Sequence, residues 1–432
     1  MKGLLLAALL AVPGPWSLQD CIDYALEHNI TLRQNRISVE QKEIALDNAQ
    51  ARRLPGLSAG SSQNFSFGRG LTADNTYANT NTTSTSFSLG TDIPIFQGFD
   101  ITNGIKMSRL DLEASTVDLE RARDDIRVAV AQAFIQILYN KEISRVAQNQ
   151  LEVDSLQTVR VEAMRMTGRA SEAEVAAQRA SSAQTRLSAV QAQNNLKLSL
   201  LELSQLLELE SPEGFDIQAP DESSLGLTLL MDPDEIYADA VGVKPVIRSE
   251  EIRLKSAEIA IERAKGGFLP SISLSGGLGT NYYTSKNMPK VQSFGEQIKN
   301  NFSQYIGLSL NVPIFSRFQN RNQLRNARLS YDTQQLQLEN AKKSLYKEIQ
   351  QAYYNAVAAQ AKYASSNEAA ASAEQSFSLT REKYENGKAN ILEYNEARNR
   401  YLEAESNLLQ ARYECLYQSR LLDFYRGRGL SF

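Results

Sequence analysis

Residues 303–315 are SQYIGLSLNVPIF, and from Ile306 onward an apolar side chain occupies every second position. The positions between them carry Gly, Ser, Asn and Pro. This alternation predicts a β-strand with one apolar face and one polar face. The flanking sequence has the composition of long helices. The fold must therefore accommodate a strand with one apolar and one polar face in a chain that is otherwise mostly helical.

Four segments alternate in this way, and we predict them as strands: 57–67, 85–96, 271–282 and 304–315. Each has about the 9–11 residues with which a tilted strand crosses a bilayer. The segments inside each strand pair, 69–84 and 284–302, are polar and are predicted to be the loops of two hairpins. The alternative is a water-soluble sandwich whose apolar faces pack together.

The chain contains an internal repeat. SFSLGTDIPIFQGFD in the first half resembles YIGLSLNVPIFSRFQ in the second. Pro94 precedes Gly168 by 74 residues. The same 74 residues separate Pro313 from Gly387. Equal spacing over this length indicates a duplicated unit. We interpret the organisation as a first repeat over 16–209, an irregular linker over 210–230 and a second repeat over 231–432.

Each repeat is predicted to hold three helices. They are 31–53, 99–166 and 170–209 in the first repeat, and 246–266, 317–385 and 388–425 in the second. Heptad-spaced apolar residues such as Leu402, Leu409 and Leu416 indicate helices packed side by side. The predicted fold class is mainly α with a small transmembrane β part, built from long antiparallel coiled-coil helices and four strands per chain. A soluble coiled-coil dimer would explain the helices but not the strands.

Four strands are too few to close a barrel. An open sheet edge in lipid would leave backbone groups unpaired, at a cost of several kcal/mol each. The chain is therefore expected to share a barrel with identical copies related by rotation. Three copies would supply twelve strands, and the polar faces would line a wet interior.

The composition excludes several classes of protein. Basic and acidic residues nearly balance, 46 against 50, which argues against a nucleic-acid binder. No Gly-rich phosphate-binding loop occurs. The single histidine, His28, and the two cysteines, Cys21 and Cys415, form no recognisable catalytic or metal-binding set. We therefore expect neither an enzyme nor a cofactor or metal ion.

The N-terminus is typical of a secretory signal peptide over 1–15, because Lys2 precedes an apolar run that ends before Pro13. Cys21 follows Leu-Gln-Asp, a poor acylation signal, so a lipid anchor is not expected. Cys415 lies on a helical apolar stripe and is predicted to be a small core residue. No apolar run reaches the roughly 18 residues of a membrane-spanning helix.

The duplication, the paired PIF segments at 94–96 and 313–315, and the turn glycines Gly168 and Gly387 resemble the TolC family of outer-membrane channels. The resemblance covers about residues 17–430. It implies a homotrimer with a twelve-stranded barrel in the outer membrane and a helical tunnel in the periplasm. It also implies an exit duct of a tripartite efflux or type I secretion system, with a periplasmic adaptor and an inner-membrane pump as partners. The alternatives are a periplasmic coiled-coil adaptor without its own pore and a secreted enzyme.

The resemblance also implies functional residues. It places adaptor docking at the two helix turns: Met166, Thr167, Gly168 and Arg169, and Glu385, Asn386, Gly387 and Lys388. It places an acidic gate ring six and nine positions after the second turn glycine, at Glu393 and Glu396, where the family has Asp. The first repeat has Glu174 at the first of these positions but Ala177 at the second. Alternatively, the glycines only cap helices and the acids are ordinary solvated charges. Arg169 or Lys388 could pair with the acids and latch a closed state.

Overall fold

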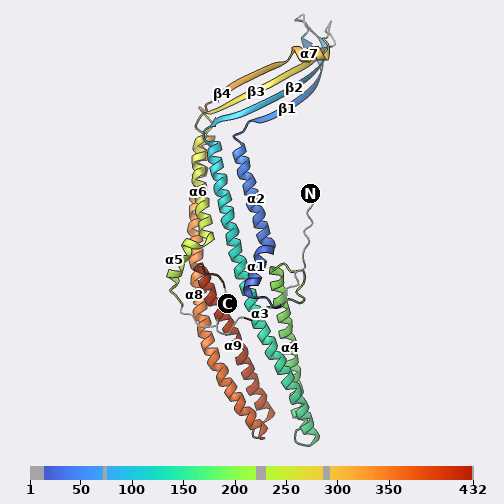
Figure 1. The fold of residues 1–432 in the computed structure, drawn as a ribbon, viewed down its shortest axis with the longest axis vertical. Coiled ribbons are helices and arrows are strands. Elements are labelled where there is room, and N and C mark those ends of the chain that lie inside the picture. The colour runs from blue at the N-terminus through green and yellow to red at the C-terminus, as the bar shows by residue number, and fades with distance from the viewer. Residues whose placement is uncertain (1–13, 72–74, 220–229, 286–291, 431–432) are drawn as a thin grey trace. The chain divides into compact units, whose positions relative to one another are not determined.

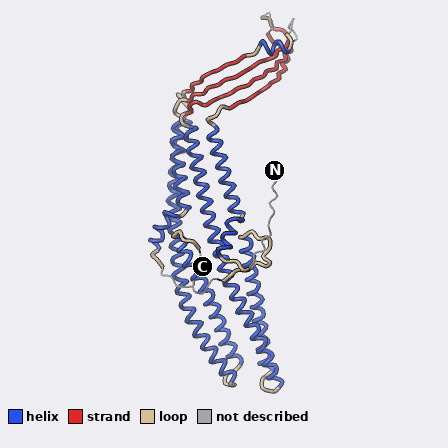
Figure 2. The backbone as a smooth tube through the Cα atoms, in the orientation of Figure 1, coloured by secondary structure: helices blue, strands red, loops and turns tan. Residues whose placement is uncertain are grey.

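The computed structural model describes residues 14–71, 75–219, 230–285 and 292–430 (Figure 1). The predicted signal peptide lies almost wholly outside these residues. The described chain divides into two compact units. Unit 1 comprises Met1–Ile37, Thr116–Arg248 and Glu339–Phe432, and unit 2 comprises Ser38–Ser115 and Ser249–Leu338. Long helices run through the boundaries, and the strands of unit 2 form one sheet (Figure 2).

The helices of the described chain are α1 (Leu18–His28), α2 (Ile30–Ala51), α3 (Asp100–Met166), α4 (Glu172–Leu206), α5 (Pro233–Val243), α6 (Pro245–Gly266), α7 (Phe294–Asn300), α8 (Gln319–Glu385) and α9 (Ile391–Tyr425). The six helices predicted from the sequence all form, with ends within three residues of those expected. The three short helices α1, α5 and α7 were not among the predicted helices. None of the described helices combines the length and apolarity that a membrane-spanning helix needs.

The strands are β1 (Gly56–Leu71), β2 (Tyr77–Gln97), β3 (Ser271–Ser285) and β4 (Ser303–Asn311). They form an antiparallel sheet in the order β1-β2-β3-β4. The predicted loop over 69–84 is wrong, because its Thr- and Asn-rich end continues β2 and pairs with β1 from Leu71 opposite Tyr77. The predicted strand end at 315 is also wrong. β4 ends at Asn311, two residues before Pro313, which has no N–H to donate to a ladder.

The register confirms the two-faced sheet. Leu89 lies opposite Ala59 on β1 and Leu278 on β3, and the next pairs along the strands join Ser88 to Gly60 and Gly279. Since paired residues share a face, one face carries the apolar side chains and the other is nearly all Ser, Gly, Thr and Asn. Several apolar residues of the first face are exposed in the chain, among them Leu57 (74%), Phe67 (77%), Ile306 (85%) and Leu308 (69%).

Helix α7 closes part of one sheet edge. Its Gln297 side chain accepts a hydrogen bond from the Tyr283 backbone N–H (2.9 Å) and donates one to the Tyr283 carbonyl (3.0 Å), as a neighbouring strand would. Gln297 is buried, and α7 begins with a capping box of Ser293 and Glu296. β4 therefore pairs with β3 only over Ser271–Gly279. The interpretation of 284–302 as a plain loop missed this helix.

In unit 2, the ends of α2, α3 and α6 meet at Asp100. Its carboxylate accepts hydrogen bonds from Arg52 (2.8 Å) and Arg263 (2.7 Å). Beside it the backbones of Gly98 and Gly266 are in direct contact: a Cβ on Gly98 would lie 2.3 Å from the Gly266 carbonyl oxygen. Gly98 also has a left-handed backbone, with φ of 57°. Only glycine fits this strand-to-helix junction.

In unit 1, the residues around Trp16 pack on the first part of the predicted linker. Trp16 forms an isolated parallel bridge with Ile217, and its ring packs edge-on against Tyr24 and Phe215. Cys21 on α1 is fully buried, and burial raises the pKa of its thiol to about 12. Cys415 is also buried, as predicted for a core residue.

Candidate functional site at the helix turns of unit 1

The two helix turns have the same construction. In the first, the Arg169 N–H donates to the Met164 carbonyl (2.8 Å), and in the second the Lys388 N–H donates to the Lys383 carbonyl (2.7 Å). The turn glycines Gly168 and Gly387 have φ of 73° and 69°. This is a left-handed helix stop, for which glycine is the favoured residue. A Cβ at either glycine would meet nothing within 4 Å, so backbone conformation and not crowding requires glycine here.

Beside each turn, one large apolar side chain is mostly exposed to solvent in the single chain. Met166, at the end of α3, is 83% exposed. Leu392, in the first turn of α9, is 72% exposed. Both side chains are therefore accessible to any partner that contacts the turns. Two of the predicted docking residues bond back into their own turns with their side chains: Thr167 donates to the Met164 carbonyl (3.0 Å) and Asn386 to the Glu382 carbonyl (2.8 Å).

Two of the three predicted gate acids begin helices. The Ser171 N–H donates to the Glu174 carboxylate (2.6 Å), and these bonds from Ser171 lower the pKa of Glu174 below its ordinary value. The repeat-related Glu393 accepts from the Asn390 side chain (3.2 Å) and donates its backbone N–H to the same side chain (2.9 Å). Both acids therefore cap α4 and α9. The Ser-x-x-Glu pattern at 171–174 was a sequence signal for this role.

The third acid, Glu396, pairs with Arg400 one turn further along α9 (2.6 Å), and both side chains are exposed. Among the ion pairs of the described residues, neither Arg169 nor Lys388 is a partner of these acids. The ion pair across the first turn joins Arg165 to Glu172 instead (3.0 Å). Within one chain the geometry therefore supplies no latch through Arg169 or Lys388.

Sequence reasoning missed a buried polar cluster further along the same helices. Arg398 on α9 is 2% exposed and Asp154 on α3 is fully buried, and the two form an ion pair. Arg398 also donates to the Ser181 hydroxyl on α4 (3.0 Å), and the Thr185 hydroxyl of α4 donates to Asp154. The cluster joins the α3–α4 hairpin to the α8–α9 hairpin. Buried charges require partners of this kind, because desolvating an unpaired charge is costly.

Some hydrogen-bonding atoms of this cluster have no protein partner. They are both amide atoms of Gln178, the Asn395 carbonyl oxygen and Arg398 Nε. Gln178 lies one helical turn before Ser181 on α4, and Asn395 one turn before Arg398 on α9. Buried water molecules commonly fill such positions.

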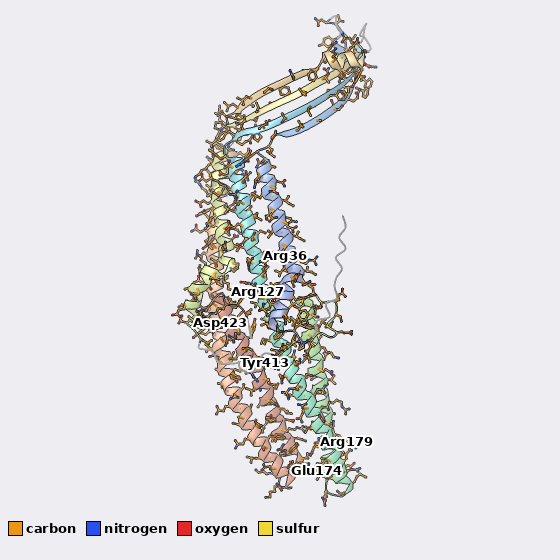
Figure 3. The ribbon with its side chains drawn as sticks, viewed as in Figure 1. Arg36, Arg127, Glu174, Arg179, Tyr413 and Asp423 are labelled. Carbon is orange, nitrogen blue, oxygen red and sulfur yellow. The ribbon has the colours of Figure 1, made fainter. Side chains whose placement is uncertain are left out.

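A different arginine, Arg179 of α4, lies near Glu174 (Figure 3). Arg179 is 66% exposed and pairs with Glu162 on α3 (2.7 Å), within its own hairpin. Exposed pairs of this kind contribute about 0–1 kcal/mol. The first hairpin thus places an arginine at its surface, whereas the second buries one.

The polar face of the sheet in unit 2 is built from small residues. Tyr283 and Tyr305 are its large residues, and the Tyr305 ring lies on Gly277 of the neighbouring strand: a Cβ there would be 2.6 Å from the ring. A glycine covered by a cross-strand aromatic ring is a known means of stabilising a strand pair. Elsewhere this face presents hydroxyl, amide and backbone groups and the carboxylate of Asp92.

A family model described as outer membrane efflux protein matches residues 21–208 and 236–428, which is most of the chain. The chain belongs to the outer membrane efflux protein family. This confirms the resemblance noted in the sequence. The protein is therefore a member of a family of outer-membrane efflux channels, and family membership favours a channel over a periplasmic adaptor.

Solved structures of similar fold include three channels of this kind. A crystal structure of CusC has a TM-score of 0.80 at 19% identity, covering 95% of this chain and 92% of CusC. The CmeC outer membrane channel of Campylobacter jejuni has a TM-score of 0.79 at 19% identity, with 96% and 86% covered. The open state of the MtrE outer membrane channel of Neisseria gonorrhoeae has a TM-score of 0.76 at 22% identity, with 96% and 89% covered. No curated protein sequence matches the chain significantly.

Proposed function

We propose that three copies of this efflux protein close a twelve-stranded barrel and a helical tunnel, and that the trimer is the passive exit duct of a tripartite efflux or type I secretion system. The observation that carries this proposal is the two-faced sheet with open edges. β1 and β4 each have one neighbour in the described sheet, and the apolar face is exposed. In lipid, only closure against further strands pairs such edges.

The helices support association of copies. α4 exposes apolar residues along one side, at Leu187 (49%), Val190 (59%), Leu198 (55%) and Leu201 (38%). Their spacing of three, eight and three residues keeps them on one face of the helix. A helix that exposes such a stripe in the isolated chain is expected to bury it against another chain.

The mass and conductance of the purified protein test this function. We expect a particle of three chains that requires detergent for extraction, and stepwise conductance increases when it is added to a planar bilayer. A monomer that salt releases from membranes, with no conductance, would rule out the duct.

A charged residue on the apolar face tests which face meets lipid. Leu308→Arg is expected to destabilise the barrel by about 2–4 kcal/mol, the cost of arginine on the lipid face near the middle of a strand. Ser309→Arg, the next residue, places the same charge on the polar face. The measurement is the thermal midpoint of the purified protein. Equal losses from the two variants would contradict the assignment of faces.

The acidic ring is tested with glutamines, because glutamine keeps the capping geometry that alanine would remove. We expect Glu393→Gln with Glu396→Gln to reduce the cation preference of the pore, since the carboxylates of three copies would attract cations to a narrow opening. The measurement is the reversal potential in a salt gradient. Unchanged selectivity together with unchanged conductance would mean that Glu393 only caps α9 and that Glu396 is only an exposed surface charge.

The exposed apolar residues at the turns are proposed to receive the periplasmic adaptor. A photo-crosslinking residue at Met166 or Leu392 is expected to form adducts with the adaptor of an inner-membrane pump in cells, identified by mass spectrometry. The same probe at Leu156, which is 67% exposed on α3 away from the turn, is the control. Adducts from Leu156 but not from the two turn positions would contradict docking of the adaptor at the turns.

A further inference from the structure

The strand-to-helix junctions of the two repeats, 96–100 and 315–319, share one backbone conformation. Counting on from the paired PIF segments, Gly98 corresponds to Arg317, and the next residue is Phe in both repeats. The backbone is left-handed at both positions of both junctions, with φ of 57° and 65° in the first and 49° and 65° in the second. The second repeat therefore holds an arginine in a conformation that favours glycine, and such strained residues are concentrated at functional sites.

The charges at the two junctions differ. In the first junction, the Asp100 carboxylate compensates Arg52 and Arg263. In the second junction, the residue at the position of Asp100 is Gln319. From 303 to 331 the chain has no acidic residue and four arginines, which are Arg317, Arg321, Arg325 and Arg328.

The four arginines are exposed, and none of them forms an ion pair with a carboxylate of the described residues. The second junction contacts the end of α6, where the Asn320 side chain donates to the Gly267 carbonyl. The last acid of α6, Glu262, pairs with Lys265 (2.6 Å). The second junction therefore carries positive charge that the fold does not neutralise.

An exposed aromatic pair lies beside Arg321. The rings of Phe315 and Phe318 meet edge to face with their centroids 5.5 Å apart, and these residues are 71% and 54% exposed. The Arg321 guanidinium lies over the Phe318 ring, 4.5 Å from its centroid. Ile314 is 94% exposed. Aromatic residues flank the apolar band of a barrel at the level of the lipid headgroups, and basic residues at a membrane surface attract anionic lipids.

We propose, on the basis of the barrel proposed above, that Arg317 and Arg321 bind the phosphate of an anionic phospholipid in the periplasmic leaflet of the outer membrane. The phosphate supplies the negative charge that Asp100 provides at the first junction and that the second lacks. Arginine suits this ligand, because its planar guanidinium donates two hydrogen bonds to one phosphate. Phe315 and Phe318 contact the glycerol and the first methylenes of the acyl chains, whereas a free phosphate ion would leave both rings in water.

Native mass spectrometry of the detergent-purified protein tests the site. The protein is given equal amounts of phosphatidylglycerol and phosphatidylcholine with the same acyl chains. We expect wild type to retain phosphatidylglycerol by about fivefold or more, the preference that one interfacial arginine supplies. Arg317→Gly with Arg321→Thr should abolish this preference. The variant keeps the backbone, because it introduces the residues that Gly98 and Thr102 provide in the first repeat, and glycine favours the left-handed conformation at 317.

Two further variants separate binding at the junction from net charge. Lys106→Gln with Arg109→Gln removes two exposed charges from α3, more than one helical turn beyond the first junction, and should leave the preference within about twofold of wild type. Gln319→Asp adds the acid of the first junction beside both arginines and should lower the preference. A preference that survives Gln319→Asp and the change of Arg317 and Arg321 would overturn the proposal. An equal fall in the α3 variant would also overturn it.

Inorganic phosphate distinguishes a lipid from a free anion. At equal ionic strength we expect phosphate and chloride to displace phosphatidylglycerol to the same extent, since neither ion contacts the aromatic rings. Stronger displacement by phosphate would assign the arginines to a soluble anion and overturn the lipid site. A conducting trimer without lipid preference would overturn this proposal alone. A monomer without conductance would instead remove the proposed function on which the lipid site rests.

Discussion

Replacing Arg398 by leucine is expected to lower the free energy of unfolding by about 3–5 kcal/mol, because it leaves the fully buried Asp154 carboxylate without its charged partner. The thermal midpoint of the detergent-purified protein, followed by circular dichroism, measures the loss. The expected loss arises from the unpaired, buried carboxylate of Asp154 and not from the lost volume of the Arg398 side chain. Adding Asp154→Leu to Arg398→Leu should therefore recover most of the stability.

The internal repeat supplies the control for this experiment. Arg179→Leu removes the related arginine, whose ion pair with Glu162 is exposed, and should cost at most about 1 kcal/mol. Similar losses of stability from the two single variants would mean that the buried ion pair of Arg398 contributes no more to stability than the exposed pair of Arg179. A double variant as unstable as Arg398→Leu would show that packing, and not charge, determines the effect.

Gly98→Val is expected to have an effect of similar size in unit 2. A valine would hold a left-handed backbone, at about 1–2 kcal/mol, and its Cβ would press on the Gly266 carbonyl, at about 1–3 kcal/mol or more. We expect a loss of about 3–5 kcal/mol, measured as the fraction of protein that resists heating in detergent. Gly56→Val is the control, because Gly56 has no neighbour within 4 Å of a Cβ. Equal stability of the two variants would contradict the close approach of the backbones.

The helices could be predicted because their ends carry strong local signals. Pro55 and Pro270 follow the first helix of each repeat, and Gly168 and Gly387 follow the long helices. Between these signals no residue interrupts the helical pattern strongly. The strand ends were harder to predict. The run of Thr, Asn and Ser that continues β2 has a loop-like composition, and only its pairing with β1 makes it a strand.

The candidate site could be predicted in part. The turn glycines and the cap at Ser171 and Glu174 are local patterns, although the cap was not recognised as one. The partnership of Arg398 could not be predicted, because Asp154 lies 244 residues away. Nothing near Arg398 distinguishes it from Arg179, and only packing of the two hairpins buries one and exposes the other. The role of Gln297 depends in the same way on its contact with Tyr283 of β3, 14 residues earlier in the chain.

The edge that Gln297 closes limits how complete a shared cylinder can be. β4 has nine residues and β1 has sixteen, so at a junction between copies at least seven residues of β1 extend past their new neighbour. The wall would then be continuous only on the side nearer the helices. Its outer rim would be lowest at each β4, because β1, β2 and β3 of each copy extend beyond the pair of Gly279 with Ser303 at which β4 begins. The height of the lipid-spanning band would be set by the shorter strand and not by the longer one.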